Sequence, residues 1–259
     1  MALIKVRAAV KHAFYRLNSL ESGSQGTPYA RARIAAKYSF ALKVLNGKNA
    51  ILDVGVGKGF GIKETGSAKT FVGIDYNAGG LKLAQEYLLD LRGRLVNASA
   101  TAIPFKNIKA ITAFEVIEHL SAKEKGVFLA ETSRALAKGG TLILSTPLHF
   151  GPIGSLNIFH WRKELTKVQL ENLLGKYFKH VDFYGMGAQP RTAGKKIALR
   201  MQELLASVDP LEIRKLFLPR GFRNKVLGKI RGANEIKPLG EYEKEGIKPF
   251  TILAVARKE

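Results

Sequence analysis

The sequence predicts an α/β fold in which helices cover a doubly wound, mostly parallel sheet. Short apolar runs alternate with longer amphipathic stretches from residue 49 to residue 183, the pattern of repeated strand–helix–strand units. A glycine-rich segment follows directly on the first of these runs. The 259 residues are 46% apolar, which suits one large domain with an appendage.

Each expected element follows from its local pattern. β-Branched and aromatic residues fill short runs bounded by Gly, Asn or charged residues, as in buried parallel strands. These strands are expected at residues 50–54, 70–74, 95–98, 110–114, 141–145, 180–184 and 249–256. Apolar residues at three- and four-residue spacing predict the covering helices. The helices are expected at residues 78–91, 123–136 and 166–174.

The loop after the first strand reads Asp53-Val54-Gly55-Val56-Gly57-Lys58-Gly59. Glycines there allow positive φ and a close approach of a ligand to the main chain. The dinucleotide fingerprint has its third glycine three residues after the second, and Phe60 occupies that position here. Asp53 would repel a pyrophosphate but suits a cation such as a sulfonium or an ammonium group. The loop therefore favours a cationic ligand over a nicotinamide dinucleotide.

Asp75 ends the second strand, about 20 residues past the loop, the spacing at which an acid meets ribose hydroxyls. Its simpler interpretation is the N-cap of the following helix. The ribose role is favoured because the glycine loop and the acid occur together in the expected strand context.

With these residues in place, the sequence resembles class I S-adenosylmethionine-dependent methyltransferases over about residues 36–186 and the last strand. Further motifs carry the resemblance: Ser99-Ala100-Thr101-Ala102-Ile103-Pro104-Phe105, Phe114-Glu115-Val116-Ile117-Glu118-His119-Leu120 and Lys138-Gly139-Gly140-Thr141-Leu142. The segment Phe159-His160-Trp161-Arg162-Lys163-Glu164-Leu165-Thr166 resembles quinone-precursor and glycan-associated members.

The resemblance implies a Rossmann-like sheet of seven strands with an antiparallel last strand, a helical insert before that strand, and S-adenosyl-L-methionine as the cofactor. Three residues depart from the family pattern: Ser99 replaces an acid that receives the adenine amino group, Lys109 replaces an acid before the fourth strand, and Leu148 replaces an Asn. The implied cofactor contacts are Asp53, Gly55, Val56, Gly57, Gly59, Asp75, Tyr76, Ser99, Ala100, Phe114 and Glu115.

Orienting the acceptor against an already activated methyl group contributes up to roughly 7–11 kcal/mol, so a general base is optional. His119 is the leading candidate for a base, because it follows the fourth strand and titrates near neutral pH. A structural histidine packed under the loop is its simpler interpretation. His149, His160 and Trp161 follow the fifth strand and are candidates for shaping the acceptor site.

The chain has no cysteine, which excludes a thiolate zinc site and cytosine methylation through a thiol adduct. The Asn/Asp-Pro-Pro-aromatic signature of exocyclic amine methylation on nucleobases is missing as well. We predict no metal site. Oxygen, ordinary amine and activated carbon acceptors remain.

The net charge of +21 is concentrated in two flanking segments, with +8 in residues 1–50 and +8 in residues 187–237. Such fields favour a polyanion, although a solvated basic surface is the simpler alternative. We expect a basic helical segment at 1–35, a methyltransferase domain at 36–186 and 249–259, and a basic helical insert at 187–248 that acts as a lid or recognises the acceptor.

Three functions follow as hypotheses. The leading one is methyl transfer to an O, N or activated C atom of a small or lipid-linked acceptor, including an anionic one. The alternatives are an RNA methyltransferase and a cofactor-binding protein without turnover. Residues 1–35 and 187–237 would contact an anionic membrane or RNA. Charges interrupt the first 20 residues, so no secretory signal is expected; we predict a cytoplasmic protein, peripheral at the membrane under the lipid hypothesis, with no obligate protein partner.

Overall fold

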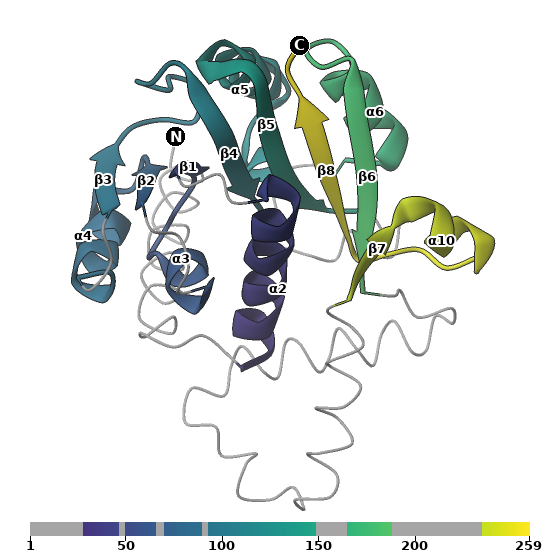
Figure 1. Cartoon of the computed structure of the whole chain (residues 1–259), viewed down its shortest axis with the longest axis horizontal. Helices are drawn as coiled ribbons and strands as arrows, with labels where there is room; N and C mark the ends of the chain where they lie inside the picture. The colour runs from purple at the N-terminus through teal and green to yellow at the C-terminus, as the bar shows by residue number, and fades with distance from the viewer. Residues whose placement is uncertain (1–27, 47–49, 66–69, 90–92, 149–164, 188–234) are drawn as a thin grey trace, which may run out of the picture. The chain divides into compact units, whose positions relative to one another are not determined.

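The computed structural model describes residues 28–46, 50–65, 70–89, 93–148, 165–187 and 235–259, and the structural statements below concern these residues (Figure 1). The chain divides into two compact units, of which the larger comprises Ile34–Gln189 and Gly232–Glu259. Most of the basic segments 1–35 and 187–248 lies outside the described residues, so the expected division into domains stays a prediction.

One sheet forms the larger unit, with the strand order β3-β2-β1-β4-β5-β8-β6-β7. The strands are β1 (Ala50–Val54), β2 (Thr70–Asp75), β3 (Gly93–Asn97), β4 (Ile108–Phe114), β5 (Leu136–Pro147), β6 (His180–Met186), β7 (Ile236–Pro238) and β8 (Thr251–Arg257). Strands β1 to β5 pair in parallel, and β8 lies antiparallel between β5 and β6. The mostly parallel sheet with an antiparallel last strand is thus confirmed.

The sheet has eight described strands, where the sequence suggested seven. The additional strand, β7, lies in residues that were expected to be part of a helical insert, and it pairs antiparallel with β6. Without β7, this end of β6 would expose a row of unpaired N–H and C=O groups. The short helix α10 (Leu239–Lys244) follows and buries Leu239 and Tyr242 against the core.

The other described helices are α2 (Pro28–Leu45), α3 (Phe60–Thr65), α4 (Ala78–Tyr87), the 3-10 helix η1 (Ile117–His119), α5 (Ala122–Ala135) and α6 (Lys167–Leu174). Side chains cap three of them, α4, α5 and α6. Ser121 and Thr166 form reciprocal capping boxes at α5 and α6. The side chain of Asn77 caps α4 by accepting from the N–H of Gly80 at 3.2 Å. Asn77 is therefore the cap of α4, and the N-cap interpretation of Asp75 is wrong.

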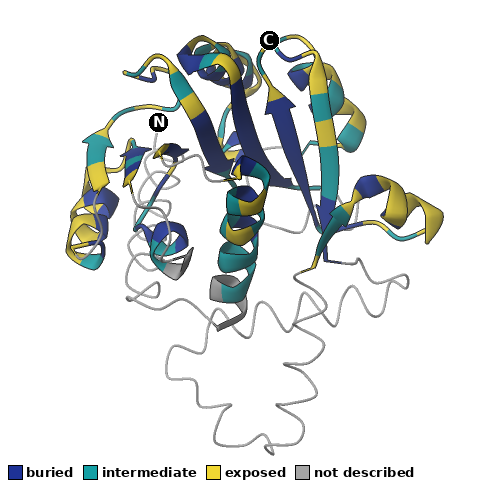
Figure 2. Cartoon of the chain, viewed as in Figure 1, coloured by how far each residue is buried: buried dark blue, intermediate teal, exposed yellow. Residues whose placement is uncertain are grey.

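Helices cover both faces of the sheet. Ala41 and Leu45 of α2 pack on Ile51, Ala110, Ile143 and Val255. On the opposite face, α5 and α6 bury Phe128, Leu129, Leu170 and Leu174 against Ile111, Leu142 and Leu144. Figure 2 shows β5 and β8 buried along most of their length, because side chains on both faces meet a helix layer. None of the described helices is long and apolar enough to span a bilayer.

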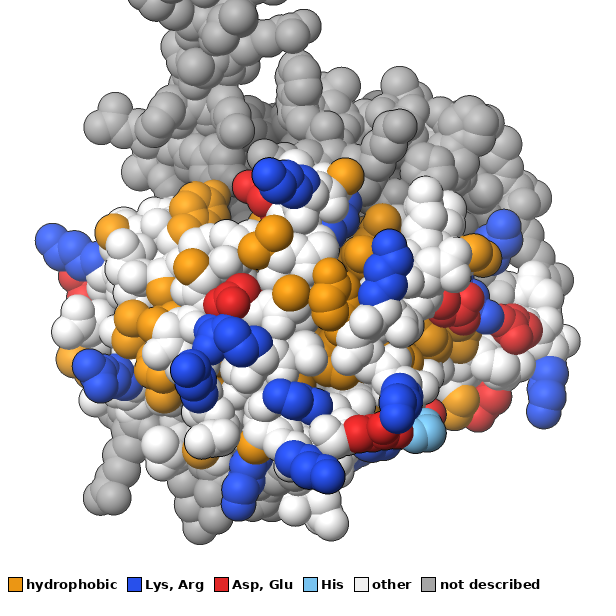
Figure 3. Space-filling view, turned by 90° about the horizontal axis from the view of Figure 1, so that it is seen from above, with side chains coloured by type: hydrophobic (Ala, Val, Ile, Leu, Met, Phe, Trp, Pro, Cys, Tyr) orange, Lys and Arg blue, Asp and Glu red, His pale blue; other side chains and the backbone are white. Residues whose placement is uncertain are grey.

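The sheet has two rims, one formed by the carboxyl ends of the parallel strands and one by their amino ends, and the two differ in character. The carboxyl ends of the parallel strands open at the lower edge in Figure 1, next to the glycine loop. The opposite edge, seen from above in Figure 3, carries more Lys and Arg side chains than acidic ones. Two cations there are paired, Lys179 with Glu259 and Arg257 with Asp182. Open α/β sheets bind their ligands outside the carboxyl ends, so the site is built from the lower edge.

Candidate functional site

The glycine loop between β1 and α3 has the backbone conformation that its sequence demands. Gly55, Gly57 and Gly59 have φ values of +78°, +56° and +80°. The N–H groups of Gly55 and Val56 donate to the carbonyl of Ile74 at 2.8 and 3.1 Å, which fixes the loop against the end of β2. A Cβ at Gly57 would meet nothing within 4 Å. Open space beside this residue fits a ligand that lies on the loop backbone.

Asp75 joins the loop to the next helix. Its Oδ2 accepts from the N–H of Gly57 at 2.9 Å, and its Oδ1 accepts from the N–H of Asn77 at 2.8 Å. Each carboxylate oxygen has a further lone pair with which to accept a hydroxyl. Tyr76 follows and is 71% exposed. The structure therefore places the expected ribose acid at the loop and leaves it the capacity to bind a diol.

Ser99 and Ala100 follow β3, beside the end of β2. The hydroxyl oxygen of Ser99 lies 2.8 Å from that of Thr101 and accepts from the N–H of Thr101 at 3.1 Å. The N–H of Ala98 donates to the carbonyl of Asp75 at 3.1 Å, which ties this turn to the ribose acid. A serine hydroxyl at this position can accept a hydrogen bond, but it lacks the charge of the acid that it replaces.

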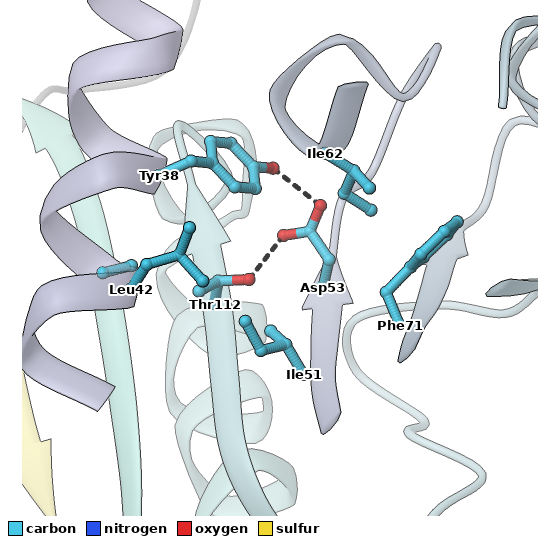
Figure 4. A pocket seen from close by; sticks show the side chains of 8 residues that line it. Tyr38, Leu42, Ile51, Asp53, Ile62, Phe71 and Thr112 are labelled. Atoms are coloured by element: carbon cyan, nitrogen blue, oxygen red, sulfur yellow. Dashed lines mark hydrogen bonds between the residues drawn. The ribbon is translucent and has the colours of Figure 1, made fainter. Parts of the chain in front are cut away.

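Asp53 is only 1% exposed, in contrast to the loop that it precedes. Its two carboxylate oxygens accept from the hydroxyls of Tyr38 at 2.6 Å and Thr112 at 2.7 Å (Figure 4). Burial raises the pKa of Asp53 to about 6, although both hydroxyls favour the ionised form. As it stands, Asp53 holds α2 to the sheet, and its expected contact with the ammonium group of the cofactor stays a prediction.

The pocket in Figure 4 lies between α2 and the sheet, beside Asp53. Ile51 and Phe71, which are paired near the amino ends of β1 and β2, contribute to its lining. Its other lining residues are Tyr38, Ala41, Leu42, Asp53, Ile62 and Thr112. Because this pocket reaches toward the amino ends of β1 and β2, away from the glycine loop, we interpret it as an interior packing gap and not as the cofactor site.

Tyr38 on α2 is a site residue that the sequence reasoning missed. Its ring meets Phe114 edge to face, with centroids 4.8 Å apart, and it also covers Gly61. A Cβ at Gly61 would lie 1.9 Å from the ring, so only glycine fits beneath Tyr38. Burial, and then the charge of Asp53, raise the pKa of Tyr38 well above its usual range. Tyr38 thus contacts two predicted cofactor residues, Asp53 and Phe114.

Lys37, the neighbour of Tyr38, is the second residue missed. Its side chain is 4% exposed, and its Nζ donates to Oε1 of Glu115 at 2.5 Å. Ser145 at the end of β5 donates to the same oxygen at 3.0 Å. Glu115 has a φ of +57°, a conformation that costs a non-glycine residue energy and is concentrated at functional sites. No local sequence signal pairs Lys37 with a residue 78 positions away.

Glu118 lies beside Glu115 and is 3% exposed. Burial, and then the charge of Glu115, raise the pKa of Glu118 well above its usual range. Its Oε2 is buried and has no hydrogen-bond partner among the described residues. We refer to Lys37, Glu115, Glu118 and Ser145 as the strand-end cluster.

His119 ends η1, and its side chain is exposed. Its predicted role as a general base stays a prediction. The acceptor-site candidates His149, His160 and Trp161 lie outside the described residues. Among the described residues, no group of three His, Asp or Glu side chains could hold a metal ion.

Comparisons with known proteins agree with this geometry. Residues 51–140 match the family model described as a methyltransferase domain. The search of curated proteins gave no match. A SAM-dependent methyltransferase from Archaeoglobus fulgidus is 15% identical, with a TM-score of 0.56, over 88% of this chain and 94% of that chain.

Two further solved structures share the fold. Phosphoethanolamine N-methyltransferase 2 from Haemonchus contortus, bound to S-adenosyl-L-methionine, is 16% identical with a TM-score of 0.55; the match covers 86% of this chain and 52% of that chain. The methyltransferase domain of bacterial CtHen1-C is 19% identical with a TM-score of 0.55, over 89% of this chain and 98% of that chain.

Residues 51–140 carry a methyltransferase domain, and the chain shares the fold of S-adenosylmethionine-dependent methyltransferases of known structure. The glycine loop and Asp75 lie where the sequence predicts contacts with that cofactor, and their binding role stays a prediction. When bound, the cofactor supplies a methyl group activated by a sulfonium.

Proposed function

We propose that this methyltransferase acts on an O, N or activated C atom of a small or lipid-linked acceptor, including one with an anionic group. The strand-end cluster carries the proposal, because it sets a carboxylate that is 35% exposed, Glu115, at the carboxyl ends of β4 and β5. The next residue, Val116, lies against Gly55 of the glycine loop. A structural neighbour from Haemonchus contortus acts on phosphoethanolamine, a small amine that bears a phosphate.

An RNA acceptor is the second candidate. The methyltransferase domain of bacterial CtHen1-C shares the fold, and a structure described as the small RNA methyltransferase HEN1 does so too, with a TM-score of 0.54. The flanking segments each carry +8, a charge that suits a phosphate backbone. The basic side chains in Figure 3 lie at the edge opposite the site, so they do not by themselves favour either acceptor. The expected cytoplasmic location also stays a prediction.

Calorimetry with S-adenosylmethionine tests the cofactor site. We expect Asp75→Ala to weaken binding at least about tenfold, because hydrogen bonds to a charged group contribute about 1.5–3 kcal/mol. Lys82→Ala, on the exposed side of α4, is the control and should bind like the wild type. Equal affinities of wild type and Asp75→Ala would refute the assignment of the ribose acid.

Methyl transfer from labelled S-adenosylmethionine tests the acceptor. The probes are phosphoethanolamine, phosphatidylethanolamine vesicles and a mixed small-RNA pool. Label in the first two supports a small or lipid-linked acceptor. Label in RNA alone, with binding that falls steeply as salt rises, supports the second candidate. Cofactor binding without label in any probe counts against both acceptor classes and favours the protein without turnover.

A further inference from the structure

The strand-end cluster contains one cation and two carboxyl groups, and their burial decides how the charges are distributed. The Lys37 side chain is 4% exposed, so its ammonium group needs an ionised partner close by. Glu115 is that partner, because its Oε1 accepts from both Lys37 and Ser145. One of these donors is a buried ammonium, and a charge-assisted hydrogen bond favours the carboxylate over the neutral acid.

Glu118 has the opposite environment. It is 3% exposed, and its Oε2 has no hydrogen-bond partner among the described residues. Burying an ionised carboxylate with an unpartnered oxygen costs much more free energy than burying the neutral acid. The charge of Glu115, and a hydrogen bond between the two glutamate side chains, disfavour a negative charge on Glu118, while Lys37 opposes this effect more weakly. The buried environment therefore favours one carboxylate, one neutral acid and one ammonium in the cluster, with no net charge.

The two carboxyl groups also differ in access. The side chain of Glu115 is 35% exposed, while Glu118 is enclosed. The positive φ of Glu115 directs this residue away from the regular course of β4, and its N–H still donates to the carbonyl of Ser145 at 3.0 Å. The carboxylate that can meet an acceptor is thus the one that Lys37 and Ser145 fix in place.

We propose that Glu115 is the catalytic base of this methyltransferase, that Lys37 is its positioning residue, and that the acceptor is a neutral hydroxyl or amine carrying the proton that Glu115 receives. This inference rests on the proposed function and narrows its acceptor class. A cluster without net charge gives a cationic acceptor little electrostatic binding energy. An acceptor without an O–H or N–H group has no proton for Glu115 to receive.

The step balances without a further reactant. The acceptor atom uses an electron pair to bond to the methyl carbon, and the electron pair of the broken carbon–sulfur bond stays on sulfur. The acceptor's proton passes to the carboxylate of Glu115, and solvent later removes it. Lys37 keeps its proton throughout and holds Glu115 in the ionised form.

Carbon-13 NMR of the full-length protein, labelled at the glutamate carboxyl carbons, tests the charge assignment without an acceptor. Glu115→Gln and Glu118→Gln identify the two resonances by their loss. At pH 7 we expect Glu118 at the shift of a neutral acid and Glu115 at that of a carboxylate. A carboxylate shift for Glu118, or a neutral shift for Glu115, would overturn the proposal.

Kinetics on whichever probe accepts label test the catalytic role. We expect Glu115→Gln to lower kcat about 100-fold or more, and Glu118→Gln to lower it less. Lys37→Met should move the acidic limb of the kcat/KM profile to higher pH by about one unit, since the carboxylate loses its cation. Lys37→Arg should restore that limb.

Glu171→Gln on α6 is the matched control, since its carboxylate pairs with Lys167 at the surface. It should stay within about twofold of the wild type. If Lys37→Met loses activity but the acidic limb of its kcat/KM profile stays at the wild-type pH, the role of Lys37 is merely structural and the proposal is overturned. The proposal is also overturned if His119→Asn loses most of its kcat while Glu115→Gln remains active. If no probe accepts label, the proposed function fails, and the NMR shifts still decide the charge assignment.

Discussion

Replacing Asp53 by Asn should change how the stability of this protein depends on pH. In the folded protein, the pKa of Asp53 is raised from 3.8 to about 6, chiefly by burial. The folded state therefore holds the proton more tightly than the unfolded state does. The stability that this proton contributes is fully present below pH 3.8 and is lost as the pH rises through 6.

The magnitude follows from the shift. A difference of about two pKa units corresponds to about 3 kcal/mol, at ~1.36 kcal/mol per unit. Because the carboxyl group is fully buried, solvent screening reduces this little. About 2 kcal/mol of the change falls between pH 4.5 and pH 7.5. Asn resembles the protonated acid and does not ionise, so the variant should lose this contribution to the pH dependence.

Urea unfolding at pH 4.5, 5.5, 6.5 and 7.5 measures the effect. The free energy of unfolding of Asp53→Asn minus that of the wild type should rise by about 2 kcal/mol from the lowest to the highest pH. Thr112→Val is the companion variant. It removes a hydrogen bond that favours the ionised form, so the wild-type pH dependence should become steeper. A difference that is flat with pH would refute the account of a buried, proton-binding Asp53.

Two further predictions concern packing and capping. Gly61→Ala should destabilise the protein by about 1–3 kcal/mol, because a methyl group there overlaps the Tyr38 ring. Gly240→Ala in α10, where a Cβ meets nothing within 4 Å, should instead be neutral or stabilising by up to about 1 kcal/mol, and thermal melts of the pair check both signs. Equal melting temperatures for the two variants would contradict the tight fit under Tyr38. Ser121→Ala should cost about 0.5–2 kcal/mol of unfolding free energy in urea, because it breaks the capping box with Glu124; a loss below ~0.3 kcal/mol would show that the cap contributes little.

The parts of the site that are local in sequence could be predicted. Gly55, Gly57 and Gly59 all have positive φ, and the alternation of glycines in the sequence predicts this conformation. Asp75 was expected at the loop because an acid that ends the second parallel strand is brought to the same sheet edge, and it bonds to Gly57 there. In both cases, a regular strand–loop–strand geometry converts sequence spacing into spatial proximity.

The parts that depend on distant contacts could not. Lys37 and Tyr38 lie on a helix before the first strand, and only the packing of α2 on the sheet brings them to Glu115 and Asp53. β7 was missed because its three residues form a strand only by pairing with the exposed edge of β6. In each case the partner lies far away in the chain.

The sequence by itself determined the class of fold and the positions of the glycine loop and Asp75, because hydrophobic periodicity and glycine conformation act within a few residues. Only the tertiary structure decided the charge states at the site. Asp53 and Glu118 are acids like any others in the sequence, but burial makes ionisation costly for both, while Glu115 is paired with the ammonium group of Lys37. The free energy of a charge depends on the solvent and counterions around it, and these are set only when α2 and the strand ends come together.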